Sequence, residues 1–261
     1  MADSDLVLLE CHDHVARLVI NRAAARNALS FPTLLRMRAL LAELRLDTNI
    51  WVIVITGAGE QAFCAGADLK ERRTMTEPQV VDFVRNIRGL MDDVANLPQP
   101  TIAAMNGHAF GGGCELALAC DLRILDIQAQ IGLTETSLAI IPGAGGTIRL
   151  PRLVGAAKAK ELILLARRLD AEEALRIGLI HRISPAGFFA GVVDEMVKAL
   201  LRNGPLALQA AKAAIDGGLD LPSEAALAHE AACYARILST TDRLEALAAF
   251  AEKRLPKFKG H

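Results

Sequence analysis

The sequence lacks the features that define several classes of protein. Its 29 basic and 30 acidic residues leave a formal net charge of −1, so no overall charge draws the chain to nucleic acid or to an anionic membrane. No uninterrupted apolar run approaches the roughly 18 residues that a membrane span needs. Its five cysteines include no Cys-x-x-Cys pair, which argues against a disulfide framework and a structural zinc site. We therefore expect a protein of a reducing compartment that binds no metal and no membrane.

The N-terminal segment offers one cluster of metal ligands, Cys11, His12 and His14. On a strand, neighbouring side chains point to opposite faces, so Cys11 and His12 would diverge. A fourth ligand is also missing. We interpret the cluster as a partly exposed strand end. The acidic residues Asp3, Asp5 and Glu10 argue against a secretory signal or a transit peptide.

Length and composition predict one α/β core followed by a helical region. The chain has 261 residues, of which 52% are hydrophobic and 23% charged, which is enough to bury a core and too apolar for disorder. Predicted strands come early and helices late, with no low-complexity linker between them. We predict a core over residues 1–200 and a helical region over 201–261. The second is rich in Ala and Leu and needs another surface to cover it, so we expect self-association.

Hydrophobic periodicity predicts the individual elements. Short apolar runs predict strands over residues 6–10, 15–21, 50–56, 101–106 and 122–125. Three-to-four spacing predicts helices over residues 31–46, 67–73, 77–97, 114–120, 156–166, 171–177, 187–200, 205–216 and 222–249. Ser30 is the expected N-cap of the first helix, with Pro32 in its first turn. Residues 57–66 are expected to form a loop.

Two glycine-bearing turns, at residues 65–68 and 111–113, each come after a buried strand and before a helix. Glycine allows a tight turn and the close approach of a ligand, and N–H groups at a helix start lack intrahelical partners. The P-loop pattern and the Rossmann spacing are both absent, so a nucleotide phosphate is not indicated. A pair of N–H donors aimed at one carbonyl oxygen fits better. For either turn alone, simple helix capping remains the alternative.

Two glutamates are candidates for acid–base chemistry. Glu115 lies among apolar residues in the first turn of a predicted helix, and Glu135 precedes the apolar turn at 138–143. Either could be an ordinary solvated carboxylate, and spacing alone does not bring the two together. If they meet in space, one could activate water while the other supplies a proton. No Gly-x-Ser-x-Gly elbow supports a serine–histidine mechanism. His108 could line the same pocket, although we favour a hydrogen-bonded structural role for it.

Three ordered segments resemble signatures of the enoyl-CoA hydratase/isomerase (crotonase) superfamily, namely residues 62–71, 111–117 and 132–147. The resemblance covers about residues 21–260, which is nearly the whole chain. It implies an α/β fold, a crotonase-like spiral of strand–strand–helix repeats with a C-terminal helical trimerisation region. It also implies a trimer, or a hexamer built as a dimer of trimers. The substrate would be an acyl-CoA thioester, with coenzyme A as part of the substrate and no separate cofactor.

The same resemblance implies roles for individual residues. The thioester oxygen would accept hydrogen bonds from the backbone N–H groups of Ala67 and Gly112. In the superfamily, the side chains at two positions decide the reaction, and in this chain these are Glu115 and Glu135. Glutamate at both positions looks like the hydratases, which add water across the 2,3 double bond of an enoyl-CoA. By analogy, Glu115 helps to activate the water and Glu135 protonates the α-carbon. Contacts to CoA or substrate are carried over onto Ala25, Arg26, Ala65, Asp68, Leu69, Lys70, Pro142, Gly143, Phe250 and Lys253. The last two can close over CoA from a neighbouring subunit. Met75, Ile87 and Leu138 are candidates for the wall of the acyl pocket.

Among subgroups, the chain is most similar to the methylglutaconyl-CoA hydratases, including the version that also binds AU-rich RNA. Where that relative has a lysine-rich helix, this chain has only Arg36, Arg38 and Arg45, offset by Glu43 and Asp47. Phosphate binding then loses its main driving force, so RNA binding is doubtful. The mitochondrial leader of the relatives is missing, which favours a bacterial cytoplasmic enzyme or a trimmed matrix form. A double-bond isomerase is the second hypothesis, and an RNA-binding protein with residual hydratase activity is the third.

Overall fold

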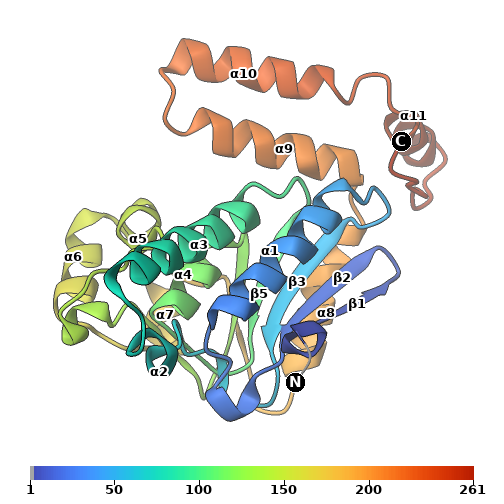
Figure 1. Cartoon of the computed structure of the whole chain (residues 1–261). Helices are drawn as coiled ribbons and strands as arrows, with labels where there is room; N and C mark the ends of the chain where they lie inside the picture. Colours follow the sequence, from blue (N-terminus) through green and yellow to red (C-terminus); the bar gives the residue numbers. More distant parts are fainter. Residues whose placement is uncertain (1–2) are drawn as a thin grey trace.

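The computed structural model describes residues 3–261 (Figure 1). It contains two sheets. The six-stranded sheet has the order β1-β2-β3-β5-β7-β10, and the four-stranded sheet has the order β4-β6-β8-β9. The strands are β1 (Val7–His12), β2 (Val15–Ile20), β3 (Val52–Gly57), β4 (Ala62–Cys64), β5 (Thr101–Met105), β6 (His108–Phe110), β7 (Leu122–Asp126), β8 (Gln130–Gly132), β9 (Leu169–Asp170) and β10 (Arg182–Ser184). Neighbouring strands are parallel except in the β1–β2 and β8–β9 pairs.

Eleven α-helices and three 3₁₀ turns occur in the described residues 3–261. The helices are α1 (Phe31–Leu46), α2 (Leu69–Arg72), α3 (Glu77–Ala95), α4 (Gly112–Ala119), α5 (Gly146–Val154), α6 (Ala156–Leu164), α7 (Ala171–Arg176), α8 (Phe189–Leu201), α9 (Pro205–Gly218), α10 (Ser223–Ala235) and α11 (Thr241–Ala251). The 3₁₀ turns are η1 (Asp3–Leu6), η2 (Ala23–Ala25) and η3 (Glu135–Leu138). Within this range, no helix is both long and apolar enough to cross a membrane.

A long strand, a short strand and a helical segment recur along the chain. β3 and β4 precede α2 and α3, β5 and β6 precede α4, and β7 and β8 precede η3 and α5. The long strands pair in one sheet and the short strands pair in the other. Each repeat therefore advances the chain by one strand in both sheets, which makes a spiral. This confirms the predicted α/β fold of strand–strand–helix repeats.

The core explains why residues 50–56 form an uninterrupted apolar run. Ile53 and Ile55 pack into a cluster with the buried faces of α1 and α3, whereas Val52 and Val54 pack with the buried face of α8. The central sheet thus lies between two helical layers, and β3 is buried on both faces. Burial of each such side chain is worth about 1.5–3 kcal/mol. The expected N-cap of α1 is also confirmed, since the Ser30 side chain accepts a hydrogen bond from the Thr33 N–H.

The sequence prediction was wrong at several short elements. The expected loop at residues 57–66 contains β4, and β6, β8, β9, β10 and α5 were not predicted. Strands of two or three residues are too short to show an alternating pattern. The single helix expected over 222–249 is two helices, because the chain leaves helical geometry after α10 and Thr240 caps the start of α11. Cys11 and His12 do belong to the end of β1, and the His14 ring stacks on Trp51.

The C-terminal helices leave an apolar surface that the chain itself does not cover. α9 and α10 form a helical hairpin that extends away from the sheets, followed by α11 (Figure 1). Neither large core cluster contains a residue beyond Val197. The exposed apolar side chains of this region include Ile215, Leu219, Leu227, Leu244 and Phe250. An exposed apolar surface of this kind marks an interaction site, so self-association through residues 201–261 stays our prediction.

Candidate active site

One cavity of about 530 Å³ brings the predicted oxyanion donors and both glutamates together. Ala67, Gly112, Glu115 and Glu135 all line it. Spacing in the sequence could not place Glu115 and Glu135 side by side, and the fold does so. A cavity with convergent polar groups and an apolar wall has the general form of a small-molecule site.

The two glycine-bearing turns meet because their preceding strands are neighbours. We expected no further strand between each long strand and its turn, but β4 and β6 intervene. These short strands pair in parallel, with Ala62 opposite His108, so their carboxyl ends lie at the same edge. A Cβ built on Gly66 would lie 3.1 Å from the Gly112 nitrogen, and one built on Gly112 would lie 3.6 Å from the Ala67 nitrogen. The backbones of the two turns are therefore in contact.

The N–H groups of Ala67 and Gly112 are free to bind a ligand. At the first turn, the Leu29 N–H donates to the Gly66 oxygen and the Asp68 N–H donates to the Leu29 oxygen. Neither hydrogen bond involves the Ala67 N–H, which lies between them in the sequence. Gly112 is the first residue of α4, where a helix offers its N–H no internal acceptor. Within residues 3–261, neither N–H donates a backbone hydrogen bond outside regular structure. Two adjacent free donors at a cavity could hold an anionic oxygen.

Glu115 is buried and fixed in orientation. It is 3% exposed, which rules out the solvated alternative. Its Oε1 accepts hydrogen bonds from the N–H groups of Ala144, at 2.7 Å, and Gly146, at 2.9 Å. Burial raises the Glu115 pKa, while the two N–H donors and the nearby charges of Arg149 and Arg88 oppose that rise. The sequence analysis missed the two amide anchors, although both lie in the glycine-rich segment 143–146.

Glu135, the first residue of η3, is the less satisfied of the two carboxyl groups. It is 9% exposed, and its Oε2 is buried without a hydrogen-bond partner in the described part of the chain. Burial, followed by the charge of Glu115, raises the Glu135 pKa to about 7. Unpaired buried carboxyl oxygens are rare unless they serve a function. A carboxyl group with a pKa near neutrality, at a cavity, suits proton transfer.

Apolar residues form much of the rest of the cavity wall. α3 contributes Phe83, Val84 and Ile87, and the segment after Glu135 contributes Leu138, Ile140 and Ile141. Of the three wall candidates from the sequence, Ile87 and Leu138 line the cavity, whereas Met75 does not. Such walls suit an acyl chain.

The residues carried over as contacts to CoA or substrate fall into several groups. Ala65, Leu69 and Gly143 line the cavity, and Pro142 is buried next to Gly143. Lys70 is exposed on α2. The Asp68 carboxylate has a structural task, because it caps α2 and forms an ion pair with Arg22 at 2.9 Å.

The remaining carried-over residues lie outside the cavity. Ala25 ends η2, and the backbone oxygen of Arg26 accepts a hydrogen bond from the Ala65 N–H at 3.0 Å. The Arg26 side chain lines a separate groove. Phe250 and Lys253 are exposed at the end of α11, which lies on the far side of the molecule from α2 (Figure 1). Within the described chain, neither residue lines this cavity.

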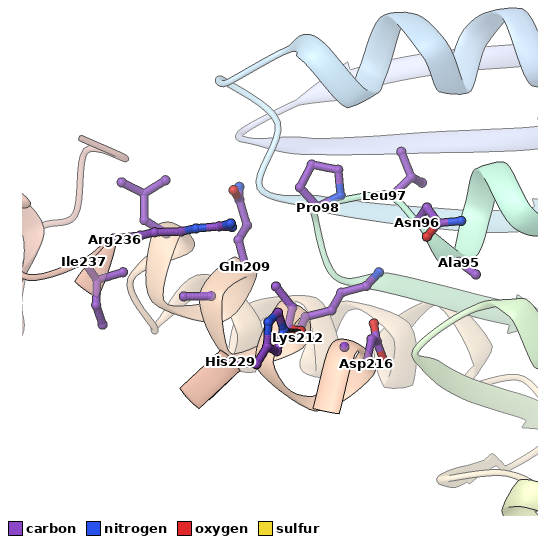
Figure 2. Close-up of a pocket in the computed structure, with 14 residues that line it drawn as sticks. Ala95, Asn96, Leu97, Pro98, Gln209, Lys212, Asp216, His229, Arg236 and Ile237 are labelled. Atoms are coloured by element: carbon purple, nitrogen blue, oxygen red, sulfur yellow. Dashed lines mark hydrogen bonds between the residues drawn. The ribbon is translucent and has the colours of Figure 1, made fainter. Parts of the chain in front are cut away.

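Two other hollows in the described part of the chain lack this combination of groups. A cavity of about 390 Å³ lies between α9, α10 and the segment 95–98 (Figure 2). Its Lys212 is 2.8 Å from Asp121, a pair that joins α9 to the core. The groove that contains Arg26 also contains His108, whose Nδ1 accepts a hydrogen bond from the Gln130 N–H at 3.0 Å. The structural role expected for His108 is confirmed.

Several known proteins are similar to this chain over nearly its full length. The family model described as enoyl-CoA hydratase/isomerase matches residues 10–261. The mitochondrial methylglutaconyl-CoA hydratase of Mus musculus is 47% identical over 249 residues, which cover 93% of this chain and 79% of the mouse protein. Human enoyl-CoA hydratase domain-containing protein 2, also mitochondrial, is 46% identical over 250 residues, covering 94% and 86% of the two chains. The crystal structure of an enoyl-CoA hydratase from Bacillus anthracis superposes with a TM-score of 0.96 at 46% identity, covering 98% of this chain and 100% of that one.

Proposed function

Because this chain belongs to the enoyl-CoA hydratase/isomerase family, we propose that it is a hydratase that adds water across the 2,3 double bond of an enoyl-CoA. The observation that carries the proposal is the pair of buried glutamates, Glu115 and Glu135, on one cavity with two free backbone N–H groups. Addition of water to a conjugated thioester needs a base, an acid and stabilisation of an enolate oxygen.

The two backbone donors would act on the thioester carbonyl. As water attacks C3, negative charge moves onto the thioester oxygen, where the N–H groups of Ala67 and Gly112 would stabilise it. Loss of one such donor typically costs about 10²–10³ in rate. Because the donors belong to the backbone, side-chain changes elsewhere in the cavity leave them in place.

The two glutamates would divide the proton transfers. Ionised Glu115, anchored through Oε1, would take a proton from the attacking water, whose oxygen bonds to C3. Glu135, whose pKa of about 7 keeps it partly protonated at neutral pH, would deliver a proton to C2. Loss of a proton from Glu115 and gain of one at Glu135 then restores the starting state.

For the substrate we propose a short-chain or branched enoyl-CoA, with 3-methylglutaconyl-CoA as the specific candidate. The 47% identity to a protein named methylglutaconyl-CoA hydratase supports it, as does a cavity of about 530 Å³. We further propose assembly as a trimer or a dimer of trimers through the uncovered apolar surface of residues 201–261. The bacterial cytoplasm or the mitochondrial matrix is the proposed compartment. RNA binding is not favoured, because Arg38 of α1 is already paired with Asp93 at 2.6 Å.

The proposal is tested with crotonyl-CoA, whose conjugation absorbance disappears on hydration. We expect turnover by the wild-type protein and losses of about 10²–10⁴ in kcat for Glu115→Gln and for Glu135→Gln, with the oligomer intact on size-exclusion chromatography. Near-normal turnover in either variant would refute the assignment. The family also includes isomerases, and deuterium uptake from solvent into a shifted double bond, without hydration, would instead identify an isomerase.

A further inference from the structure

The segment that anchors Glu115 is rich in glycine and needs support from outside. Residues 143–146 read Gly-Ala-Gly-Gly, and glycine loses more conformational freedom on ordering than any other residue. Gly145 also has a φ of 103°, in the left-handed region that glycine favours. Two N–H groups of this segment nevertheless hold Glu115 Oε1, at 2.7 and 2.9 Å. Contacts with the rest of the chain must therefore fix the segment in place.

The carbonyl groups of the segment show which contacts fix it. The Gly143 oxygen accepts hydrogen bonds from Arg88 Nε and Nη2, at 3.3 and 3.2 Å. The Ala144 oxygen accepts a hydrogen bond from Arg149 Nη1 at 3.1 Å. The Gly145 oxygen accepts one from the backbone N–H of Arg149 at 2.8 Å. The peptide group that the Arg149 side chain holds thus lies between the two peptide groups whose N–H groups hold the carboxylate.

The Arg149 side chain is itself held in place. Arg149 is the fourth residue of α5, and its Nη2 forms an ion pair with Asp92 of α3 at 2.8 Å. The side chain is 21% exposed. Its guanidinium lies against the backbone of Gly145, because a Cβ built on that glycine would overlap Nη1. Arg88 is exposed and lines the cavity, whereas Arg149 does not line it, so Arg149 can act on the reaction only through the segment and its charge.

The charge of Arg149 acts in the same direction as its hydrogen bond. Burial raises the Glu115 pKa, the two N–H groups of the segment oppose this rise, and the charges of Arg149 and Arg88 oppose it further. The charged groups that act on Glu115 from neighbouring elements are Arg88 of α3, Arg149 of α5 and Glu135 of η3. Removal of the Arg149 side chain would take away both a support of the segment and a positive charge near the proposed base.

We propose that Arg149 is a positioning residue for Glu115, because it holds residues 143–146 in the conformation that presents two N–H groups to the carboxylate. This inference rests on the proposed hydratase function and adds to it a residue outside the cavity. A displacement of about 1 Å, caused by a change far from the reacting atoms, can cost about 10²-fold in rate. Loss of this support should therefore slow the attack of water on C3 without weakening the binding of the thioester.

The test measures kcat, KM and the pH dependence of kcat/KM for the hydration of crotonyl-CoA. Arg149→Gln should lower kcat by about 10- to 100-fold and leave KM within about threefold of the wild-type value. The acid limb of its profile, where protonation of Glu115 stops the reaction, should move to higher pH by about half a unit or more. Arg149→Lys keeps the charge but not the planar fork, so it should restore the position of the limb and recover part of kcat.

Arg152→Gln is the matched control, because Arg152 lies on the same helix, is exposed and pairs with Asp220 at 2.8 Å. Its kinetics should equal those of the wild type. Asp92→Asn removes a negative charge and keeps the arginine, so its acid limb should not move to higher pH. An Arg149→Gln profile that is lower at every pH, with its acid limb unmoved, would mean a purely structural role and overturn the inference. An equal upward shift in Asp92→Asn, or an equal loss in Arg152→Gln, would also overturn it.

Hydrogen exchange of residues 143–146 in the free protein tests the same contact without turnover. The amides of this segment should exchange about tenfold faster or more in Arg149→Gln than in the wild type, and at the wild-type rate in Arg152→Gln. Unchanged exchange in Arg149→Gln would overturn the inference. If the wild type hydrates no thioester while exchange responds as expected, the hydratase proposal fails and the support of Glu115 by Arg149 stands, so the two failures are distinguishable.

Discussion

Replacement of Glu135 by glutamine should stabilise the folded protein at neutral pH while it removes activity. Burial and the charge of Glu115 raise the Glu135 pKa from 4.5 to about 7. In the unfolded chain the same carboxyl group ionises freely in water near its ordinary pKa. At pH values above that pKa, ionisation of Glu135 therefore favours the unfolded state. The resulting loss of folding stability grows until the pH passes the folded-state pKa.

The size of the effect follows from the two pKa values. Each pKa unit corresponds to about 1.36 kcal/mol, so ionisation of Glu135 costs the folded state about 3 kcal/mol at pH 8 and above, and less than about 1 kcal/mol at pH 5. Glutamine does not titrate. The side-chain amide of the variant lies where Oε2 has no hydrogen-bond partner. This unsatisfied group lowers the free energy of unfolding by about 1 kcal/mol at every pH. The variant should thus be about 2 kcal/mol more stable than the wild type at pH 8, and the difference should nearly vanish at pH 5.

Urea denaturation of the wild type and the variant at both pH values, at one fixed protomer concentration, measures this difference. Glu172→Gln provides the control, because Glu172 is exposed on α7. A stability difference between Glu135→Gln and the wild type that does not change between the two pH values would contradict the assigned environment of Glu135. The same pH trend in Glu172→Gln would do so as well.

Three further predictions concern the site and the assembly. Hydration should slow as the pH rises through about 7, because Glu135 must be protonated to act as the acid; a flat profile of kcat/KM between pH 6 and 9 would contradict this role. Gly112→Ala places a methyl group 3.6 Å from the Ala67 nitrogen and should lower kcat by about 100-fold or more in a folded protein. Gly113→Ala places a methyl group 2.0 Å from the Cys64 oxygen and should prevent folding. Circular dichroism and soluble yield would distinguish the two variants. Leu244→Asp changes an exposed apolar residue of α11 and should reduce the mass measured by light scattering to that of a smaller assembly or a monomer; an unchanged mass would locate the interface elsewhere.

The sequence predicted the elements that carry a long pattern and missed those that do not. Residues 50–56 and 77–97 contain enough apolar positions to define β3 and α3, whereas β4 and β6 are three residues long and show no period. The Ala-rich stretches on either side hid the break between α10 and α11, although Thr240 followed by Asp242 is a recognisable helix start.

The candidate site shows the same limit. The three motifs indicated Glu115, Glu135, Ala67 and Gly112, all of which line one cavity. They did not indicate that the amides of Ala144 and Gly146 anchor Glu115, because every residue except proline carries a backbone N–H and the contact spans 29 positions or more. The missing partner of Glu135 Oε2 was equally invisible, since an unpaired oxygen is a property of packing and not of residue type.

The free N–H groups of Ala67 and Gly112 have a consequence for how this scaffold changes over evolutionary time. A codon substitution alters a side chain and leaves the peptide group in place, so the proposed binding of a thioester oxygen would be inherited almost independently of residues 115 and 135. Under the proposed mechanism, replacement of either acid would alter which protons are moved while the carbonyl is still polarised. New reactivity can therefore arise in a descendant that has not first lost its hold on the ligand.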